Sequence, residues 1–172
     1  MSSENYPSWT LFWQALAYNW VCIEALQMAP CDVFIDTIGV GFAYPLVKLL
    51  FGCRIVSYTH YPTISSDMVS QINEKMAGKS FLARMLKHIY YFALKLAYSC
   101  CGRFADAIAT NSSWTDAHIR SLWAQDSKTT LIYPPCDTQD LVDNDPDFRA
   151  EREPALMSFA QFRPEKNHVQ QL

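Results

Sequence analysis

Residues 53–62 read CRIVSYTHYP, and this stretch decides the fold class of the chain. Its first seven residues are rich in β-branched and aromatic side chains, which is typical of a buried strand, and the proline marks where a strand must end. Three further runs are predicted as strands: DVFID at 32–36, ADAIAT at 105–110 and TTLIY at 129–133. Each run is bounded by glycine, proline or polar residues, so the sequence predicts four short strands before residue 134.

Helical patterns separate these strands. Apolar residues at steps of three and four predict helices over 9–28, 42–51, a stretch from about 66 that breaks at Gly78 and resumes over 80–101, and 113–123. Gly52 is expected to cap the second helix in a left-handed conformation, and Gly102 to end the third. Ser113 and Asp116 have the spacing of a capping box at the start of the last helix. Strands alternating with helices predict an α/β fold: a Rossmann-like parallel sheet with right-handed crossovers and helices on both faces.

A change of composition divides the chain. Residues 137–154, DTQDLVDNDPDFRAEREP, are polar and acidic and contain two prolines, which predicts a connector. A new strand and the start of a helix are predicted over 155–172, and one strand with an unfinished helix does not make a domain. We therefore interpret the chain as truncated, with the later part of one domain at 1–136 and the beginning of a second at 155–172.

The bulk composition excludes several functions. Half of the 172 residues are apolar and 18% are charged, which favours a buried core over disorder. A net charge of −3 lacks the basic excess of nucleic-acid binders, so no nucleic acid is expected as a partner. The six cysteines and four histidines show no zinc-like spacing and no C-x-x-C pair, so we expect free thiols and neither a metal nor a cofactor. Neither a signal peptide nor a membrane-spanning segment is predicted.

Residues 81–101 predict a helix with a narrow basic stripe. At 100° per residue its polar side chains fall within roughly 100° of arc, and they are Arg84, Lys87, His88, Tyr91 and Lys95. Two interpretations are open at this point. The helix is either a core helix with one solvated edge or an interfacial helix whose stripe meets anionic head groups. In the second case the residues that dip into lipid are Phe81, Leu82, Met85, Leu86, Ile89 and Phe92.

His60 is the first candidate site residue because it follows the predicted strand 53–59 directly. Doubly wound folds bind ligands outside the carboxyl ends of their strands. A histidine at that place can donate a hydrogen bond to a substrate oxygen and titrates near neutrality. The residues alone leave a purely structural histidine open as the alternative.

A second candidate site lies at residues 158–167, SFAQFRPEKN. A junction from strand to helix offers free backbone N–H groups and the positive end of a helix dipole. Together with Arg163 and Lys166 these groups would suit a diphosphate. A solvated loop of mixed charge is the alternative explanation.

Five motifs in one order, CDVFIDTIG, SYTHYPTISSDM, NSSWT, LIYPPCD and QFRPEKNH, run through residues 31–168. They resemble the α-1,2-mannosyltransferases that add the fourth and fifth mannoses to dolichol-pyrophosphate-linked oligosaccharide, which are retaining GT-B glycosyltransferases. The resemblance implies two Rossmann-like domains that face a cleft. It implies GDP-mannose as donor on the C-terminal domain and the lipid-linked acceptor on the N-terminal one. It also implies the cytosolic face of the endoplasmic reticulum membrane and a complex with other mannosyltransferases of the pathway.

The same resemblance implies residue roles. His60 would hydrogen-bond the donor mannose or stabilise the transition state, and Lys166 would lie against the donor pyrophosphate. Arg163 would be a phosphate ligand, although the family's arginine position falls on Gln161, two residues earlier. Which of these two positions carries the ligand stays open.

The resemblance further implies family segments on both sides of this chain: a membrane anchor with a glycine-rich loop before residue 6, and a donor-binding glutamate pair after residue 172. This stretch alone is therefore expected to be inactive. Two other functions stay open. One is a non-catalytic membrane or scaffold protein that keeps the acceptor half, and the other is a mannosyltransferase of an earlier step in the same pathway.

Overall fold

The computed structural model describes residues 9–64, 78, 80–139, 143, 159 and 168–171. The chain divides into two compact units, Met1–Pro134 and Pro135–Leu172, and each is considered by itself. The described helix of the second unit is α8 (His168–Gln171). The assignment of these parts to an acceptor domain, a connector and a donor domain stays a prediction.

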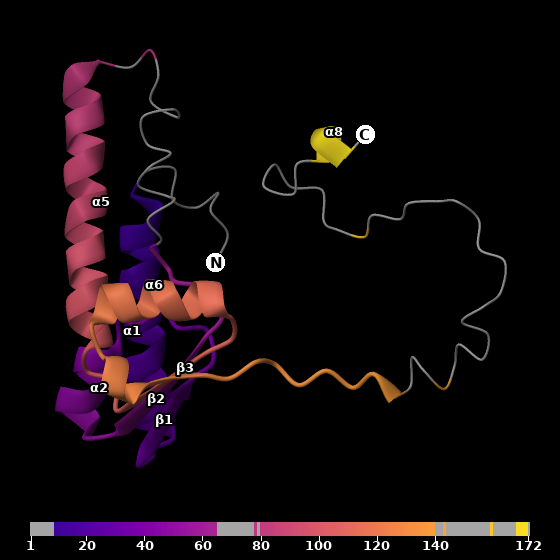
Figure 1. Ribbon diagram of the computed structural model, residues 1–172. Coiled ribbons are helices and arrows are strands. Elements are labelled where there is room, and N and C mark those ends of the chain that lie inside the picture. The colour runs from indigo at the N-terminus through magenta and orange to yellow at the C-terminus, as the bar shows by residue number, and fades with distance from the viewer. Residues whose placement is uncertain are drawn as a thin grey trace, which may run out of the picture. The chain divides into compact units, whose positions relative to one another are not determined.

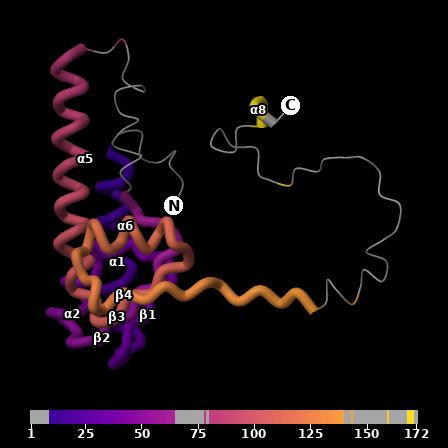
Figure 2. Tube along the Cα trace, viewed as in Figure 1, coloured from indigo at the N-terminus to yellow at the C-terminus, as the bar shows by residue number. Residues whose placement is uncertain are grey.

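The first unit alternates helices and strands (Figure 1). Its elements are α1 (Thr10–Met28), β1 (Val33–Asp36), α2 (Tyr44–Phe51), β2 (Arg54–Thr59), α5 (Phe81–Gly102), β3 (Ala107–Thr110), α6 (Ser113–Trp123), the 3-10 helix η2 (Asp126–Lys128) and β4 (Thr129–Leu131). The four strands form one parallel sheet in the order β1-β2-β3-β4, which can be followed along the trace in Figure 2. The predicted α/β fold with a parallel sheet is confirmed.

Each strand of this sheet pairs with the strand that precedes it in the chain. A right-handed crossover between successive neighbours always passes over the same face, so the helices that join β1 to β4 gather there. Burial agrees, because Ile55, Ser57 and Thr59 are buried on the helix-covered face of β2. On the opposite face Val33 and Ile35 of β1 are exposed.

Three aromatic side chains form the centre of the core. Tyr44, Tyr98 and Trp123 are each fully buried, and they come from α2, α5 and α6. The ring centroid of Trp123 lies 5.8 Å from that of Tyr44 and 5.4 Å from that of Tyr98. Gly102 at the end of α5 makes room for this packing, because a Cβ there would lie 2.2 Å from the indole of Trp123. The three helices are thus fixed to one another through a single indole ring.

Two local predictions need correction. The N-cap of α6 is Ser112, whose hydroxyl accepts from the backbone N–H of Thr115, and not Ser113. Asp116 does not close a capping box, because its carboxylate accepts instead from the hydroxyl of Thr110 and from Arg120. Gly102 is the last residue of α5, so the helix ends there as predicted.

Other local predictions are confirmed. Gly52 ends α2 with φ of 69°, the left-handed conformation that favours glycine. All six cysteines are free. The helix expected from about residue 66 up to Gly78 lies outside the described residues except for Gly78 itself.

Candidate functional site

His60 is the first residue after β2 and lies at the carboxyl edge of the sheet. Its Nδ1 is 3.3 Å from the side-chain amide nitrogen of Asn111, which directly follows β3. An amide nitrogen only donates, so Nδ1 accepts and a neutral ring carries its proton on Nε2. The exposed imidazole of His60 is therefore held with Nε2 as a hydrogen-bond donor, as the candidate role requires.

Two further contacts hold His60. The hydroxyl of Thr115 in α6 donates to the backbone carbonyl of His60 over 3.1 Å. The ring of Tyr58 meets the imidazole edge-on, with 4.9 Å between the ring centroids. The backbone and the ring are thus positioned from β2 and from the start of α6.

Asp36 organises the neighbouring loop after β1. Its buried carboxylate accepts from the backbone N–H groups of Ile38, Gly39 and Val40 at 2.8, 3.0 and 3.1 Å and from the hydroxyl of Tyr44 at 2.8 Å. The carbonyl of Gly39 in turn accepts from the hydroxyl of Tyr98 over 2.8 Å. The Asp36 carboxylate therefore holds the loop at the carboxyl edge of the sheet and links it to α2 through Tyr44. Tyr98 links the same loop to α5.

An exposed aromatic stack lies beside His60, and the sequence analysis missed it. The rings of Tyr61 and Trp114 stack with centroids 5.1 Å apart and an interplanar angle of 20°. His118 lies one turn further along α6, and the centroid of its ring is 3.9 Å from that of the Trp114 ring. The available signal was that the motifs SYTHYPTISSDM and NSSWT follow neighbouring strands and each carries an aromatic residue just past the strand end.

Asp116 and Arg120 fasten α6 to the sheet. Arg120 donates to the Asp116 carboxylate over 2.7 Å and to the backbone carbonyl of Thr129, at the start of β4, over 2.7 Å. The hydrogen bond from Arg120 holds the pKa of Asp116 below its ordinary value, and the Thr110 hydroxyl acts in the same direction. The ionised carboxylate thus joins the end of β3 to α6.

This pKa shift predicts an acid-dependent stability. A carboxyl group whose pKa is depressed by folding stabilises the native state above its unfolded pKa, near 3.8, and loses that contribution as pH falls through the folded pKa. We expect Asp116→Asn to be less stable than the wild type at about pH 7, and the difference between them to be smaller at about pH 2, where the carboxyl group is protonated in the unfolded state. Urea unfolding at both pH values measures this, and an equal difference at both would contradict it.

The second candidate site cannot be placed against the first. Arg163, Lys166 and Gln161 lie outside the described residues. The expectation that His60 and the two cations face each other across a crevice therefore stays a prediction. Within the described part of the chain no cluster of three His, Cys, Asp or Glu could hold a metal ion.

The first half of α5 carries exposed apolar side chains. Phe81 is 74% exposed and Phe92 69%, and the buried side chains of α5 come only from Leu94 onward. The first half of α5 therefore presents apolar side chains at the surface of this chain, and its contact with a membrane stays a prediction. In the described ranges no helix is both long enough and apolar enough to cross a membrane.

Comparison with known proteins places this geometry in a family. The family model for the ALG11 mannosyltransferase N-terminus matches residues 1–123. Proteins named GDP-Man:Man(3)GlcNAc(2)-PP-Dol alpha-1,2-mannosyltransferase are similar: that of Homo sapiens is 41% identical over 177 residues, that of Mus musculus 40% over 182, and that of Kluyveromyces lactis 38% over 169. These alignments cover 97%, 100% and 98% of this chain but 36%, 37% and 30% of the relatives.

The chain thus spans about a third of the length of these curated relatives. No solved structure matches it. The family match covers the whole edge where His60, Asn111 and Trp114 meet. The chain belongs to the ALG11 mannosyltransferase N-terminus family.

Proposed function

We propose that this chain is the acceptor-side part of a retaining GT-B mannosyltransferase that moves mannose from GDP-mannose, in α-1,2 linkage, onto dolichol-pyrophosphate-linked oligosaccharide. The products carry the fourth and fifth mannoses of the glycan. The observation that carries this proposal is the similarity of about 40% along nearly the whole chain to relatives with that printed name. The reaction takes place at the cytosolic face of the endoplasmic reticulum membrane, in a complex with other mannosyltransferases of the pathway.

The carboxyl edge supports a role in this chemistry. The contact of Nδ1 with Asn111 leaves Nε2 of His60 available, and Nε2 would donate to an oxygen of the donor mannose. The charge that develops on the departing GDP must be stabilised as the sugar leaves. The stack of Tyr61 and Trp114 offers an aromatic surface of the kind on which a sugar ring lies with its C–H bonds toward the rings. Arg163 and Lys166 would neutralise the diphosphate from the donor side.

The test is a chimera in which this chain replaces the matching segment of the Kluyveromyces lactis relative. In that protein we expect His60→Ala to lower kcat for mannose transfer about a hundredfold, because one aligned donor to the transition state is lost. Transfer of labelled mannose from GDP-mannose to the Man(3)GlcNAc(2)-PP-dolichol acceptor measures it.

Arg54→Ala is the matched control, since Arg54 is exposed at the opposite end of the same strand. It should leave kcat at the wild-type value. An active chimera in which His60→Ala keeps wild-type kcat would remove His60 from the reaction.

Two alternatives give different results. A scaffold protein would bind vesicles and show no binding of GDP in calorimetric titration. A mannosyltransferase that retains its donor side should bind GDP in the same titration. For that titration we expect Lys166→Ala to weaken binding about ten- to a hundredfold, because one charge-assisted phosphate bond contributes roughly 1.5 to 3 kcal/mol. A mannosyltransferase of an earlier step would make the chimera prefer shorter acceptors.

A further inference from the structure

Helices α1 and α5 form a pair that reaches past the carboxyl edge of the sheet. Each ends only a few residues before a strand, α1 before β1 and α5 before β3, so both run opposite to the strands. They touch where the start of α1 meets the middle of α5: the backbone N–H of Phe12 donates to the hydroxyl of Tyr90, and the ring of Trp9 packs edge-on against the same tyrosine. Phe81 lies nine residues before Tyr90, so α5 extends about 13 Å past this contact. Figure 1 shows α5 reaching beyond the start of α1.

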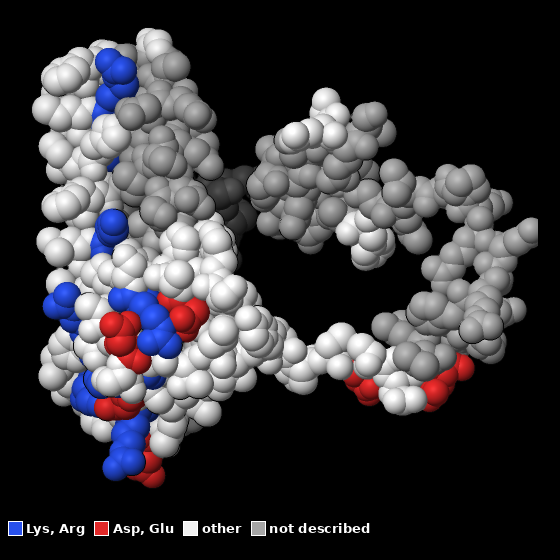
Figure 3. Space-filling model, in the orientation of Figure 1, with Lys and Arg blue, Asp and Glu red and all other residues white. Residues whose placement is uncertain are grey.

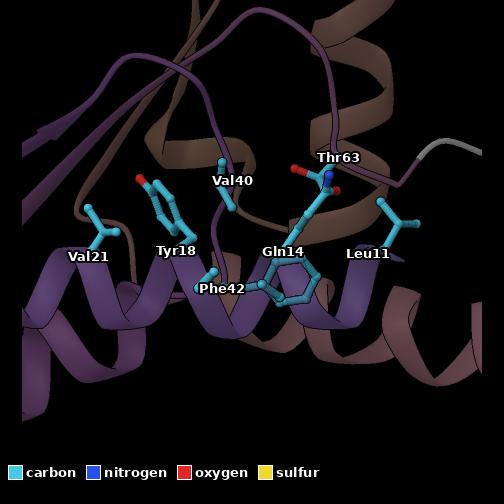
Figure 4. Close-up of a pocket in the computed structure, with 9 residues that line it drawn as sticks. Leu11, Gln14, Tyr18, Val21, Val40, Phe42 and Thr63 are labelled. Carbon is cyan, nitrogen blue, oxygen red and sulfur yellow. The ribbon is translucent and has the colours of Figure 1, made fainter. Parts of the chain in front are cut away.

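A cavity of about 350 Å³ lies under α1 at the carboxyl edge (Figure 4). Leu11, Ala15, Ala17 and Val21 of α1 line it from one side. Val40 and Phe42, in the loop that Asp36 shapes, and Thr63, just after His60, close it from the other. Its walls are almost entirely hydrocarbon, with polar atoms contributed by Gln14, Tyr18 and Thr63.

A second cavity of about 490 Å³ adjoins the first. It is formed by the start of α1 and the first half of α5, and its lining residues are Trp9, Thr10, Leu11, Ala83, Leu86, Lys87, Tyr90 and Tyr91. Leu11 lines both cavities. This second cavity differs from the first in carrying a cation, Lys87, on its wall.

On the described residues of α5, the charge beside the groove has one sign. Helix α5 contains Arg84, Lys87 and Lys95 and no acidic residue, and the only charged residue of α1 is Glu24, near its far end. Figure 3 shows the blue side chains spaced along α5, whereas red ones gather lower down. An apolar groove with a cationic wall fits a ligand that combines a hydrocarbon chain with an anionic group.

We propose that the two cavities form one groove for the phosphate-proximal isoprene units of a prenyl phosphate lipid, with Lys87 beside the lipid phosphate. This inference rests on the proposed function, because it assigns the lipid portion of the acceptor to a site. The groove holds the first isoprene units at the carboxyl edge.

Binding to this chain alone, without GDP-mannose, tests the groove. We expect farnesyl diphosphate to bind in calorimetric titration, and farnesol to bind more weakly. Ala17→Phe fills the hydrocarbon cavity and should weaken farnesyl diphosphate at least about tenfold. Ala117→Phe adds the same ring to an exposed position on α6 and should leave the affinity unchanged. Circular dichroism of both variants must show the wild-type fold, and equal affinities in two folded variants would overturn the proposal.

The cation has its own control on the same helix. Lys87→Glu should weaken farnesyl diphosphate about tenfold or more and leave farnesol unchanged. Lys95→Glu makes the same charge change at a residue that does not line the cavity and should have little effect. Equal losses in both variants would mean a diffuse electrostatic effect in place of a phosphate site.

Vesicles separate a prenyl site from general membrane attraction. Phosphatidylcholine vesicles doped with dolichyl phosphate should bind the chain more tightly than vesicles with the same fraction of phosphatidic acid, and Ala17→Phe should abolish the difference. Equal binding of the chain to the two kinds of vesicle would contradict the proposal.

In the active chimera, Ala17→Phe should raise KM for the lipid acceptor with kcat nearly unchanged. If transfer fails in the wild-type chimera while the chain still binds farnesyl diphosphate through Ala17 and Lys87, the proposed function fails and the groove stands.

Discussion

Replacing Asp36 by alanine is expected to lower the free energy of unfolding by about 3 kcal/mol, because it leaves several buried or half-buried donors without an acceptor. The carboxylate accepts from three consecutive backbone N–H groups and from the hydroxyl of Tyr44. A loss of this size is a large fraction of the stability of an ordinary domain. Urea unfolding monitored by tryptophan fluorescence measures it.

Two companion variants show whether the carboxylate is responsible. Asp36→Asn keeps one acceptor oxygen and replaces the other by a donor, so it should lose less than alanine but still more than about 1 kcal/mol. Ser57→Ala removes the buried hydroxyl that lies 2.8 Å from the Tyr44 oxygen and should cost only about 1 kcal/mol. An alanine variant at position 36 no less stable than Ser57→Ala would show that the loop does not depend on Asp36.

Replacing Gly102 by alanine is expected to destabilise the fold by about 1 to 3 kcal/mol through overpacking. The sign of this change in stability is informative, because alanine in place of a helical glycine ordinarily stabilises a protein by up to about 1 kcal/mol. Here the added methyl group would lie 2.2 Å from atoms of the Trp123 indole, which is fully buried and cannot move aside freely. Thermal unfolding of the chain gives the comparison.

A double-mutant cycle tests whether the overpacking in Gly102→Ala is against Trp123. In a Trp123→Phe background the smaller ring leaves space at Gly102, so the penalty of Gly102→Ala should shrink or vanish. If Gly102→Ala stabilises the wild type, or its penalty is the same in both backgrounds, the close approach of helix and indole does not limit the packing.

The sequence was sufficient for the order of elements because each strand is short, apolar and followed by a turn residue. The β2 stretch at residues 53–59 is the clearest case, since only its first residue falls outside the observed strand Arg54–Thr59. The bounds of α6 were predicted correctly, but its N-cap was assigned one residue too late, because Ser112 and Ser113 are chemically equal as caps. Only the backbone conformation at Ser112, with φ of −153° and ψ of 157°, decides between them.

The site was only partly predictable. His60 was predicted because it directly follows a strand that one continuous segment of sequence identifies. Its partner Asn111 and the stack of Tyr61 with Trp114 were not found, since they come together only when β2 and β3 pair. The two cavities have no local signal either, because segments far apart in sequence must pack against α1 before any hollow exists. The sequence indicated Gly102 only as the end of a helix, whereas the structure shows that its lack of a side chain leaves space for the indole of Trp123 in α6.

The monotonic order of the sheet has a consequence for how the polypeptide is made. Every strand from β2 to β4 finds its only earlier neighbour already synthesised, and none has to wait for a later segment or insert between two existing strands. The sheet can therefore grow along one edge as the nascent chain leaves the ribosome, with N-terminal structure forming first. Until β3 emerges, the open edge of β2 is the place where a stalled nascent chain would mispair, and that is where a ribosome-associated chaperone would have most to protect.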